Sequence, residues 1–486
     1  MGRNWRLGVN NLLVMKFGGT SMGSADRIRA AAELVRKYQS QRPTLVVVSA
    51  MSKVTDLLLD TLRAAEHGED ETVETNLKTL GQRHASTCGD LLTGSSLDDA
   101  ILGVTGIVSE FRRIASGVRM LGVRPPASVD EAVATGERLS ASMLAAYLES
   151  EGVRAQAVNA RDVIVTDAFF GNATPFMEPT REKAAQILEP LVAQGIVPIV
   201  TGFNGATADN RPTTLGRGGS DFSASILAAA MDANEVYIWT DVDGIMTADP
   251  RLVPDPAVLD EVTYREAAEL AYNGAKVLHP RTLAPLVERQ IPVWSKNSFK
   301  PETPGTKIVP ELASHVVGGP RAVTSMQGVA LISLEPKSAE VSGTRVMARA
   351  LEALASASVE LLAMTSSSYR QSFCILIRKD DLRRAMASLE ATLSLELAHG
   401  YVEPLGADEN VGLLAIVGEG MQGAPGWAGR IFTAISREHV NIIAIAQGSS
   451  ELTIAVVVAR DGLDKAVRAV HAECHMGENA RAGVLS

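Results

Sequence analysis

The chain has 486 residues, which at about 150 residues per domain suggests roughly three domains. Hydrophobic residues make up 46% of it, enough for sizeable cores, so a chain that is disordered throughout is excluded. The net charge is −10, which argues against a general binder of nucleic acid or of anionic membranes, because either function needs a basic face. A local basic pocket for a phosphorylated ligand remains compatible with this charge.

The cysteines and the N-terminus indicate the compartment. Cys88, Cys374 and Cys474 are far apart and form no CxxC pair, which argues against a disulfide framework and a structural zinc site. Residues 1–11 are predicted to be a leader whose apolar run is too short for a signal peptide. No stretch reaches the roughly 18 apolar residues of a membrane span. We therefore expect a cytoplasmic protein.

The first predicted elements form a βαβ unit. Residues 12–17 (LLVMKF) read as a buried strand, 25–39 as a helix with apolar residues at helical spacing, and 44–51 as a second buried strand. A Gly-rich turn joins the first strand to the helix. The two strands should therefore be parallel, because a crossover helix connects them.

The alternation of strands and helices continues to about residue 308. Helices are expected over 55–120, 130–150, 180–194, 221–232, 264–278 and 280–289, and strands over 163–167, 196–203, 235–242 and 291–296. Buried strands that alternate with helices predict an open, mostly parallel α/β sheet with helices on both faces.

The remainder of the chain contains an internal repeat. Strand, helix, strand, strand and helix are expected over 328–336, 343–358, 359–368, 371–377 and 379–393. The same order recurs over 412–420, 426–439, 441–450, 451–458 and 463–474. Each copy has about 80 residues, too few to bury much core alone, so the copies should pack on each other or on another subunit.

Two Gly-rich loops at strand ends have the composition of phosphate sites. Residues 16–21 (KFGGTS) combine glycines that allow close backbone approach, a helix N-terminus and the point charge of Lys16. Residues 216–221 (GRGGSD) place Arg217, which can bind a carboxylate or phosphate through two hydrogen bonds, among three glycines. A plain turn remains the alternative for both loops, and Ser220 could simply cap the following helix.

Two further segments are ambiguous alone. Residues 239–251 (WTDVDGIMTADPR) hold three aspartates but lack the spacing and terminal Glu of an EF-hand, and solvated turn chemistry is the alternative. Glu137 in 134–137 (ATGE) could simply stabilise the start of its helix, because a negative charge there interacts favourably with the helix dipole. No nucleophile triad stands out, and His84 and His279 are isolated. Phosphoryl transfer suits this inventory, because it needs cations, backbone donors and a metal but no protein nucleophile.

Together these motifs resemble those of aspartate kinases in the amino-acid kinase family. The matching segments, in order, are KFGGTS (16–21), SAMSKVTD (49–56), ATGE (134–137), GRGGSD (216–221), TDVDGIMTADPR (240–251) and GAKVLHP (274–280). The repeats resemble two ACT domains, the modules that bind amino-acid effectors. The resemblance implies a three-layer αβα kinase domain over 12–308 and α+β ACT domains over 320–400 and 408–480, with 309–327 pairing with the second.

The resemblance implies ATP-dependent phosphorylation of the L-aspartate β-carboxylate, with Mg²⁺, and no metal ligands of the protein are identified. Catalytic roles fall on Lys16, Asp221 and Lys276. Aspartate contacts fall on Thr55, Glu137, Phe203, Arg217 and Ser220. ATP contacts fall on Lys16, Phe17, Gly18, Gly19, Thr240, Asp241, Met246, Arg251 and Lys276. An effector, lysine or threonine, is expected near Gly418, Asn441 and Gln447.

Three other interpretations stay open. A glutamate, acetylglutamate or uridylate kinase would share the fold but not this motif set with paired ACT units. The chain could be the kinase half of a bifunctional enzyme fused to homoserine dehydrogenase, although nothing resembling a dehydrogenase follows within it. It could also be an inactive amino-acid sensor, against which the intact Lys16, Glu137, Arg217 and Asp221 count. A homodimer or larger homo-oligomer is expected through the ACT units, with no nucleic-acid or membrane partner.

Overall fold

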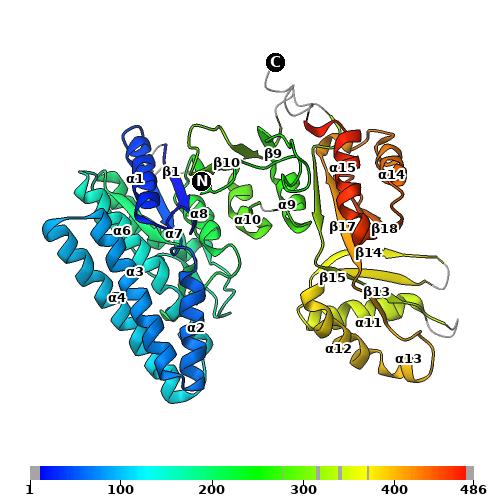
Figure 1. Ribbon diagram of the computed structural model, residues 1–486, viewed down its shortest axis with the longest axis horizontal. Helices are drawn as coiled ribbons and strands as arrows, with labels where there is room; N and C mark the ends of the chain where they lie inside the picture. Colours follow the sequence, from blue (N-terminus) through cyan, green and yellow to red (C-terminus); the bar gives the residue numbers. More distant parts are fainter. Residues whose placement is uncertain (1–10, 276, 313–317, 338–341, 369–370, 478–486) are drawn as a thin grey trace, which may run out of the picture. The chain divides into compact units, whose positions relative to one another are not determined.

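The computed structural model describes residues 11–275, 277–312, 318–337, 342–368 and 371–477. These residues form two compact units, and Figure 1 labels many of their helices and strands. The first unit holds the chain up to Ile245, Asp260–Tyr264 and Leu278–Glu311, and the second holds Met246–Leu259, Arg265–Val277 and the chain from Leu312. Two segments that precede residue 278 thus belong to the second unit. The domain boundaries expected from the sequence remain predictions.

The first unit is built on an eight-stranded sheet. In spatial order its strands are β3 (Ala155–Val158), β5 (Val197–Thr201), β2 (Thr44–Val48), β1 (Leu13–Phe17), β8 (Glu235–Thr240), β10 (Val293–Asn297), β11 (Thr306–Val309) and β9 (Glu261–Thr263). Every neighbouring pair is parallel except β10 with β11. The predicted mostly parallel sheet is confirmed.

Helices cover both faces of this sheet, which confirms the expected three-layer architecture. On one face lie α1 (Ala25–Gln39) and α6 (Thr135–Ser150), and on the other α7 (Met177–Ala193), α8 (Gly219–Ala230) and α10 (Pro280–Arg289). Outside α6 pack α2 (Val54–His67), α3 (Asp70–Leu91) and α4 (Gly94–Leu121) (Figure 1). The short helix α5 (Pro126–Val133) follows α4 in the chain.

Local sequence accounts for the elements of the first βαβ unit. Every residue of β1 and β2 is buried, as expected for strands covered on both faces. The helix α1 spans the predicted 25–39, because Ser24 accepts a hydrogen bond from the backbone of Arg27 as its N-cap and the apolar stripe faces the core. Among the described residues no helix is both long enough and apolar enough to span a membrane.

Two expectations for this unit are wrong in detail. The strand expected over 163–167 is the two-residue β4 (Val165–Thr166), which joins β6 (Asn204–Thr207) and β7 (Pro212–Thr214) in a small separate sheet. The helix expected over 130–150 is interrupted at Ala134, where α5 ends and α6 begins. The interruption lets the first turn of α6 approach a neighbouring loop closely.

The second unit contains the two repeats. The first forms the sheet β14 (Leu361–Ser366), β15 (Phe373–Arg378), β13 (Val329–Leu334) and β16 (Gly406–Asp408), with α11 (Gly343–Ser356), α12 (Leu382–Thr392) and α13 (Ser394–Ala398). The second forms β12 (Ala322–Met326), β17 (Val411–Val417), β19 (Thr453–Ala459) and β18 (Ile442–Gln447), with α14 (Trp427–Arg437) and α15 (Leu463–Glu473). Both sheets are antiparallel, and both copies keep the predicted strand–helix–strand–strand–helix order. The helix α9 (Tyr264–Tyr272) belongs to this unit from Arg265 onward.

Candidate active site

The candidate site lies where three parallel strands of the first unit end. Phe17, the last residue of β1, is in register with Val48 of β2, which is in register with Thr201 of β5. The loops that follow these strands therefore meet at one edge of the sheet. Ligands of open α/β sheets bind at this carboxyl edge.

A cavity of about 540 Å³ opens there. It is lined by Lys16, Gly19, Ser49, Ala50, Met51, Ser52, Lys53, Thr55, Asp56, Glu137, Phe203, Gly216, Arg217, Gly218, Gly219, Ser220 and Asp221. All these residues belong to the first unit. They come from four of the motifs that the sequence singled out and from the turn after β5.

Lys16 and Asp221 form an ion pair in this cavity. The Lys16 ammonium lies 2.6 Å from a carboxylate oxygen of Asp221, and the side chains are 11% and 21% exposed. Asp221 lies in the first turn of α8, where the helix dipole favours a negative charge. At Gly18 a β-carbon would lie 3.4 Å from the Lys16 ammonium, so glycine there leaves the cation accessible. The pair places a cation at the Gly-rich loop after β1, as a phosphoryl group requires.

The 216–219 loop needs its glycines. Gly216 and Gly218 have φ of 76° and 68°, in the left-handed region that other residues rarely adopt. At Gly219 a β-carbon would lie 2.4 Å from the Phe203 ring. Arg217 projects from this loop, is exposed and has no ion pair among the described residues. Its guanidinium is therefore available to a ligand.

Glu137 is a buried carboxylate with one free oxygen. It is 3% exposed, and one oxygen accepts a hydrogen bond of 3.1 Å from the Ala50 backbone. The other oxygen has no hydrogen-bond partner in the described part of the chain. Burial raises the pKa of this carboxyl to about 7, although the Ala50 hydrogen bond lowers it. A ligand cation would satisfy the free oxygen and favour the ionised form.

The first turn of α6 must lie against the loop after β2 to place Glu137. At Gly136 a β-carbon would lie 2.6 Å from the β-carbon of Ala50 and 3.1 Å from Val54. Any larger residue would push α6 and the loop apart. This packing explains the glycine of the ATGE segment.

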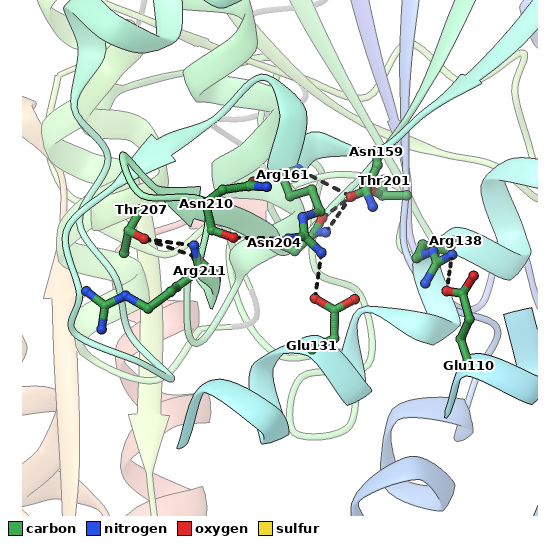
Figure 2. A network of polar contacts seen from close by, with 10 residues as sticks. All are labelled: Glu110, Glu131, Arg138, Asn159, Arg161, Thr201, Asn204, Thr207, Asn210 and Arg211. Atoms are coloured by element: carbon green, nitrogen blue, oxygen red, sulfur yellow. Dashed lines mark hydrogen bonds and ion pairs between the residues drawn. The ribbon is translucent and has the colours of Figure 1, made fainter. Parts of the chain in front are cut away.

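Phe203 is held in a left-handed conformation by a polar network. Its φ is 72°, and the Asn204 backbone donates to the Gly202 carbonyl at 2.9 Å, which closes a three-residue turn. Beside it, the Thr201 hydroxyl donates to Asn204 at 2.9 Å, and the Asn204 amide donates to Asn159 at 2.9 Å (Figure 2). Strained residues of this kind gather at functional sites. The network holds the turn that carries Phe203, a residue that lines the cavity.

The buried Asp130 anchors the strand that leads into the 216–219 loop. Its carboxylate accepts hydrogen bonds from the Thr214 backbone, the Thr214 hydroxyl and the Gly171 backbone, at 2.8, 2.9 and 2.8 Å. Burial raises the pKa of Asp130, and these three hydrogen bonds lower it. Sequence reasoning missed this residue, because a single Asp in a predicted helix carries no signal of what it will contact.

The loop after β10 supports the end of β8, and sequence reasoning missed it as well. The Ser298 backbone and hydroxyl donate to the Thr240 carbonyl at 2.9 and 3.1 Å. Asn297 and Lys300 donate to the Asp243 carboxylate at 2.5 and 3.2 Å. The sequence held a signal for this contact. The predicted strands over 291–296 and 235–242 end at the same edge of the sheet, so the loops that follow them are expected to meet.

Two parts of the chain are similar to known protein families. Residues 11–297 match the model of the amino acid kinase family, and residues 414–474 match an ACT domain model. The chain belongs to the amino acid kinase family. The match covers the eight-stranded sheet up to β10 and every residue that lines the cavity.

The similar proteins include bifunctional aspartokinase/homoserine dehydrogenases and an aspartokinase of known structure. The chloroplastic bifunctional aspartokinase/homoserine dehydrogenase 1 of Arabidopsis thaliana is 34% identical over 476 residues, which are 96% of this chain and 52% of that protein. The chain thus spans about half the length of the first curated relatives it matches. E. coli aspartokinase III in complex with aspartate and ADP is 29% identical, with a TM-score of 0.80 over 96% of this chain and 100% of that one. The same enzyme in complex with lysine and aspartate is 30% identical, with a TM-score of 0.77 over 95% and 99%.

The cavity of this amino acid kinase brings together eight of the predicted site residues: Lys16, Gly19, Thr55, Glu137, Phe203, Arg217, Ser220 and Asp221. The Phe17 side chain lies instead in the core, stacked on Trp239, so a nucleotide contact would need its backbone. Met246 and Arg251 belong to the second unit, and Lys276 lies outside the described residues. The individual roles of all these residues remain predictions.

The predicted effector residues lie in the second repeat. At Gly418 a β-carbon would lie 2.5 Å from the Gly319 carbonyl and 2.8 Å from the Arg321 nitrogen, so packing within the unit already accounts for this glycine. Asn441 and Gln447 are exposed, just before and at the end of β18. Their role in effector binding remains a prediction. In the described part of the chain, no group of three or more His, Cys, Asp or Glu side chains could hold a metal ion.

Proposed function

We propose that the chain transfers the γ-phosphoryl group of ATP to the β-carboxylate of L-aspartate, forming 4-phospho-L-aspartate, the first step towards lysine, threonine, methionine and diaminopimelate. The observation that carries this proposal is the charge pattern of the cavity. Glu137 offers a free buried oxygen for an ammonium, and Arg217 an unpaired guanidinium for a carboxylate. The similarity to an aspartokinase in complex with aspartate and ADP supports the same choice.

The reaction needs no proton transfer. An oxygen of the aspartate β-carboxylate, ionised at neutral pH, attacks the γ-phosphorus while the bond to the β,γ-bridging oxygen breaks and ADP leaves. The protein therefore has to position the two reactants and neutralise the phosphates. The Lys16 ammonium supplies a cation for this task, and the backbone at Gly19, which lines the cavity, supplies a donor.

Mg²⁺ should accompany ATP. This ion usually binds through one or two carboxylates together with substrate phosphates. Asp221 is a carboxylate of the cavity next to Lys16 and suits such a role. When bound, the ion would neutralise phosphate charge during the transfer.

The activity is tested by supplying ATP and Mg²⁺ with one acceptor at a time, measuring ADP release, and trapping any acyl phosphate with hydroxylamine. L-Aspartate should yield the hydroxamate together with ADP, whereas L-glutamate, N-acetyl-L-glutamate and uridylate should not react. Excess chelator should abolish turnover. Reaction of another acceptor in place of aspartate would assign a different kinase, and no reaction with any acceptor would favour an amino-acid sensor.

The pH dependence of aspartate use should report Glu137. Because the pKa of this carboxyl is raised to about 7, the free enzyme loses the anion that receives the substrate ammonium as pH falls. We expect kcat/KM for aspartate to fall about tenfold per pH unit below about 7, at saturating ATP. In Glu137→Gln, kcat/KM should be low and flat over this range. The matched control Glu110→Gln, which removes a carboxylate paired with Arg138 instead, should keep the wild-type profile (Figure 2).

Glu137→Gln should also stabilise the free protein at high pH. A raised carboxyl pKa in the folded state means that ionisation destabilises the fold as pH rises past the ordinary value. The Tm of Glu137→Gln should therefore exceed that of wild type at pH 8, and the difference should shrink at pH 5. An unchanged Tm at pH 8 would contradict the claim that the buried, ionised Glu137 destabilises the fold.

An amino-acid effector is proposed at the ACT units, supported by the ACT match over 414–474 and by the similarity to an aspartokinase in complex with lysine. An effector inhibits only through different affinities for two conformations. Gln447→Ala should shift inhibition by lysine or threonine to higher concentration and leave the uninhibited kcat near wild type. Gln327→Ala, another exposed Gln of this unit, serves as control. Unchanged inhibition in Gln447→Ala and Asn441→Ala would place the effector in the first repeat.

Homo-oligomerisation and a cytoplasmic location remain predictions from the sequence.

A further inference from the structure

Arg83 is a cation outside the cavity that contacts two of the loops around it. It lies on α3, and it is half-buried. One guanidinium nitrogen donates to the Ser52 carbonyl at 2.9 Å, and the other lies 3.4 Å from the Gly23 carbonyl. Among the described residues Arg83 has no ion pair with a carboxylate, so its charge is directed at the loop carbonyls.

The two loops are also joined to each other at one point. The backbone and the hydroxyl of Ser52 both donate to the Gly19 carbonyl, at 3.2 and 2.9 Å. At Gly19 a β-carbon would lie 3.0 Å from the Ala50 carbonyl, which shows how close the two backbones are. Ser52 is thus held from both sides: its donors bind Gly19, and its carbonyl accepts from Arg83.

The peptide that Arg83 holds precedes a strained residue. The Ser52 carbonyl belongs to the peptide bond with Lys53, whose φ of 66° lies in the left-handed region that non-glycine residues rarely adopt. Lys53 lines the cavity and immediately precedes α2. Strained conformations of this kind persist only where the surroundings hold them. The Arg83 hydrogen bond is one such restraint.

We propose that Arg83 is a positioning residue for phosphoryl transfer, which fixes the 49–53 loop against the 18–24 loop. This inference rests on the proposed function. The 49–53 loop carries the Ala50 backbone that binds Glu137, and the 18–24 loop carries Gly19 at the predicted phosphoryl site. A small misplacement of reacting groups can lower a rate by orders of magnitude. Arg83 therefore acts on the rate through the alignment of both loops and touches neither substrate.

The kinetic test compares Arg83→Met with Arg112→Met, a matched change on α4 whose guanidinium pairs with Glu74. We expect kcat to fall about tenfold or more in Arg83→Met, with a smaller change in either KM, and to stay near wild type in Arg112→Met. Arg83→Lys keeps the charge and can donate to one carbonyl, so it should recover part of the loss. A kcat in Arg83→Met within twofold of the control would overturn the proposal, as would equal kcat values in the Lys and Met variants.

A second measurement does not depend on activity. Hydrogen exchange of the backbone amides in 49–53, including the Ser52 amide bound to Gly19, should quicken in Arg83→Met and stay unchanged in Arg112→Met. Unchanged exchange in Arg83→Met would refute the restraint whatever the enzyme phosphorylates. If wild type phosphorylates no acceptor while exchange quickens only in Arg83→Met, the restraint stands, and the proposed function fails together with the catalytic part of the inference.

Discussion

Replacing Lys16 with Met should lower kcat by about 100-fold or more, the largest effect we expect from a single substitution. The Lys16 side chain is 11% exposed, and its ammonium pairs with Asp221 and lies next to Gly18. Positioning and electrostatics supply most of the catalysis of phosphoryl transfer, and Met keeps the length of the side chain without its charge. The rate is measured by ADP release at saturating aspartate and ATP.

The fold should survive the Lys16 substitution. Asp221 loses its partner but keeps the favourable helix N-terminus and some contact with solvent, since its side chain is 21% exposed. We therefore expect a modest change in Tm. Lys37→Met, which removes an exposed ammonium from α1, is the control and should keep the wild-type rate. A Lys16→Met enzyme with more than a tenth of the wild-type kcat would place the phosphoryl group elsewhere.

Replacing Arg217 with Ala should raise the KM for aspartate, or lower kcat/KM, by about tenfold or more. Arg217 lines the cavity without an ion pair in the described chain, so its two-nitrogen edge is free for a substrate carboxylate. The KM for ATP should change much less, because the predicted role of Arg217 is on the amino acid. Arg217→Lys should restore only part of the loss, because an ammonium lacks the planar two-donor geometry.

Arg211→Ala is the matched control for Arg217. Arg211 lies six positions earlier (Figure 2). Its guanidinium pairs with Asp209. Its loss should leave the kinetics of both substrates near wild type. Aspartate kinetics that are equal in Arg217→Ala and Arg211→Ala would remove Arg217 from the substrate pocket.

Local sequence patterns determined most of the fold. The strand and helix of 12–39 and the two repeats could be predicted from the sequence. In each of them, apolar residues recur at strand or helix spacing, and a turn ends the run. The short strands β6 and β7 could not, because they are polar and three or four residues long, and their pairing rather than their sequence makes them strands.

The sequence by itself also determined which segments carry the chemistry. Lys16, Glu137, Arg217 and Asp221 stand in recognisable motifs, and these four line one cavity. Their motifs lie up to about 200 residues apart, so only the parallel sheet, which brings the carboxyl ends of β1, β2 and β5 to one edge, shows that they meet.

Only the tertiary structure decided how the site is supported. Asp130 and Arg83 read as ordinary charged helix residues, yet one binds Thr214 and the other the Ser52 carbonyl. The buried free oxygen of Glu137 and its raised pKa follow from the approach of α6 to Ala50, which Gly136 permits. Such properties depend on which distant groups share a space. Helical periodicity records only which face of an element is apolar, so it cannot specify the partner of a polar side chain.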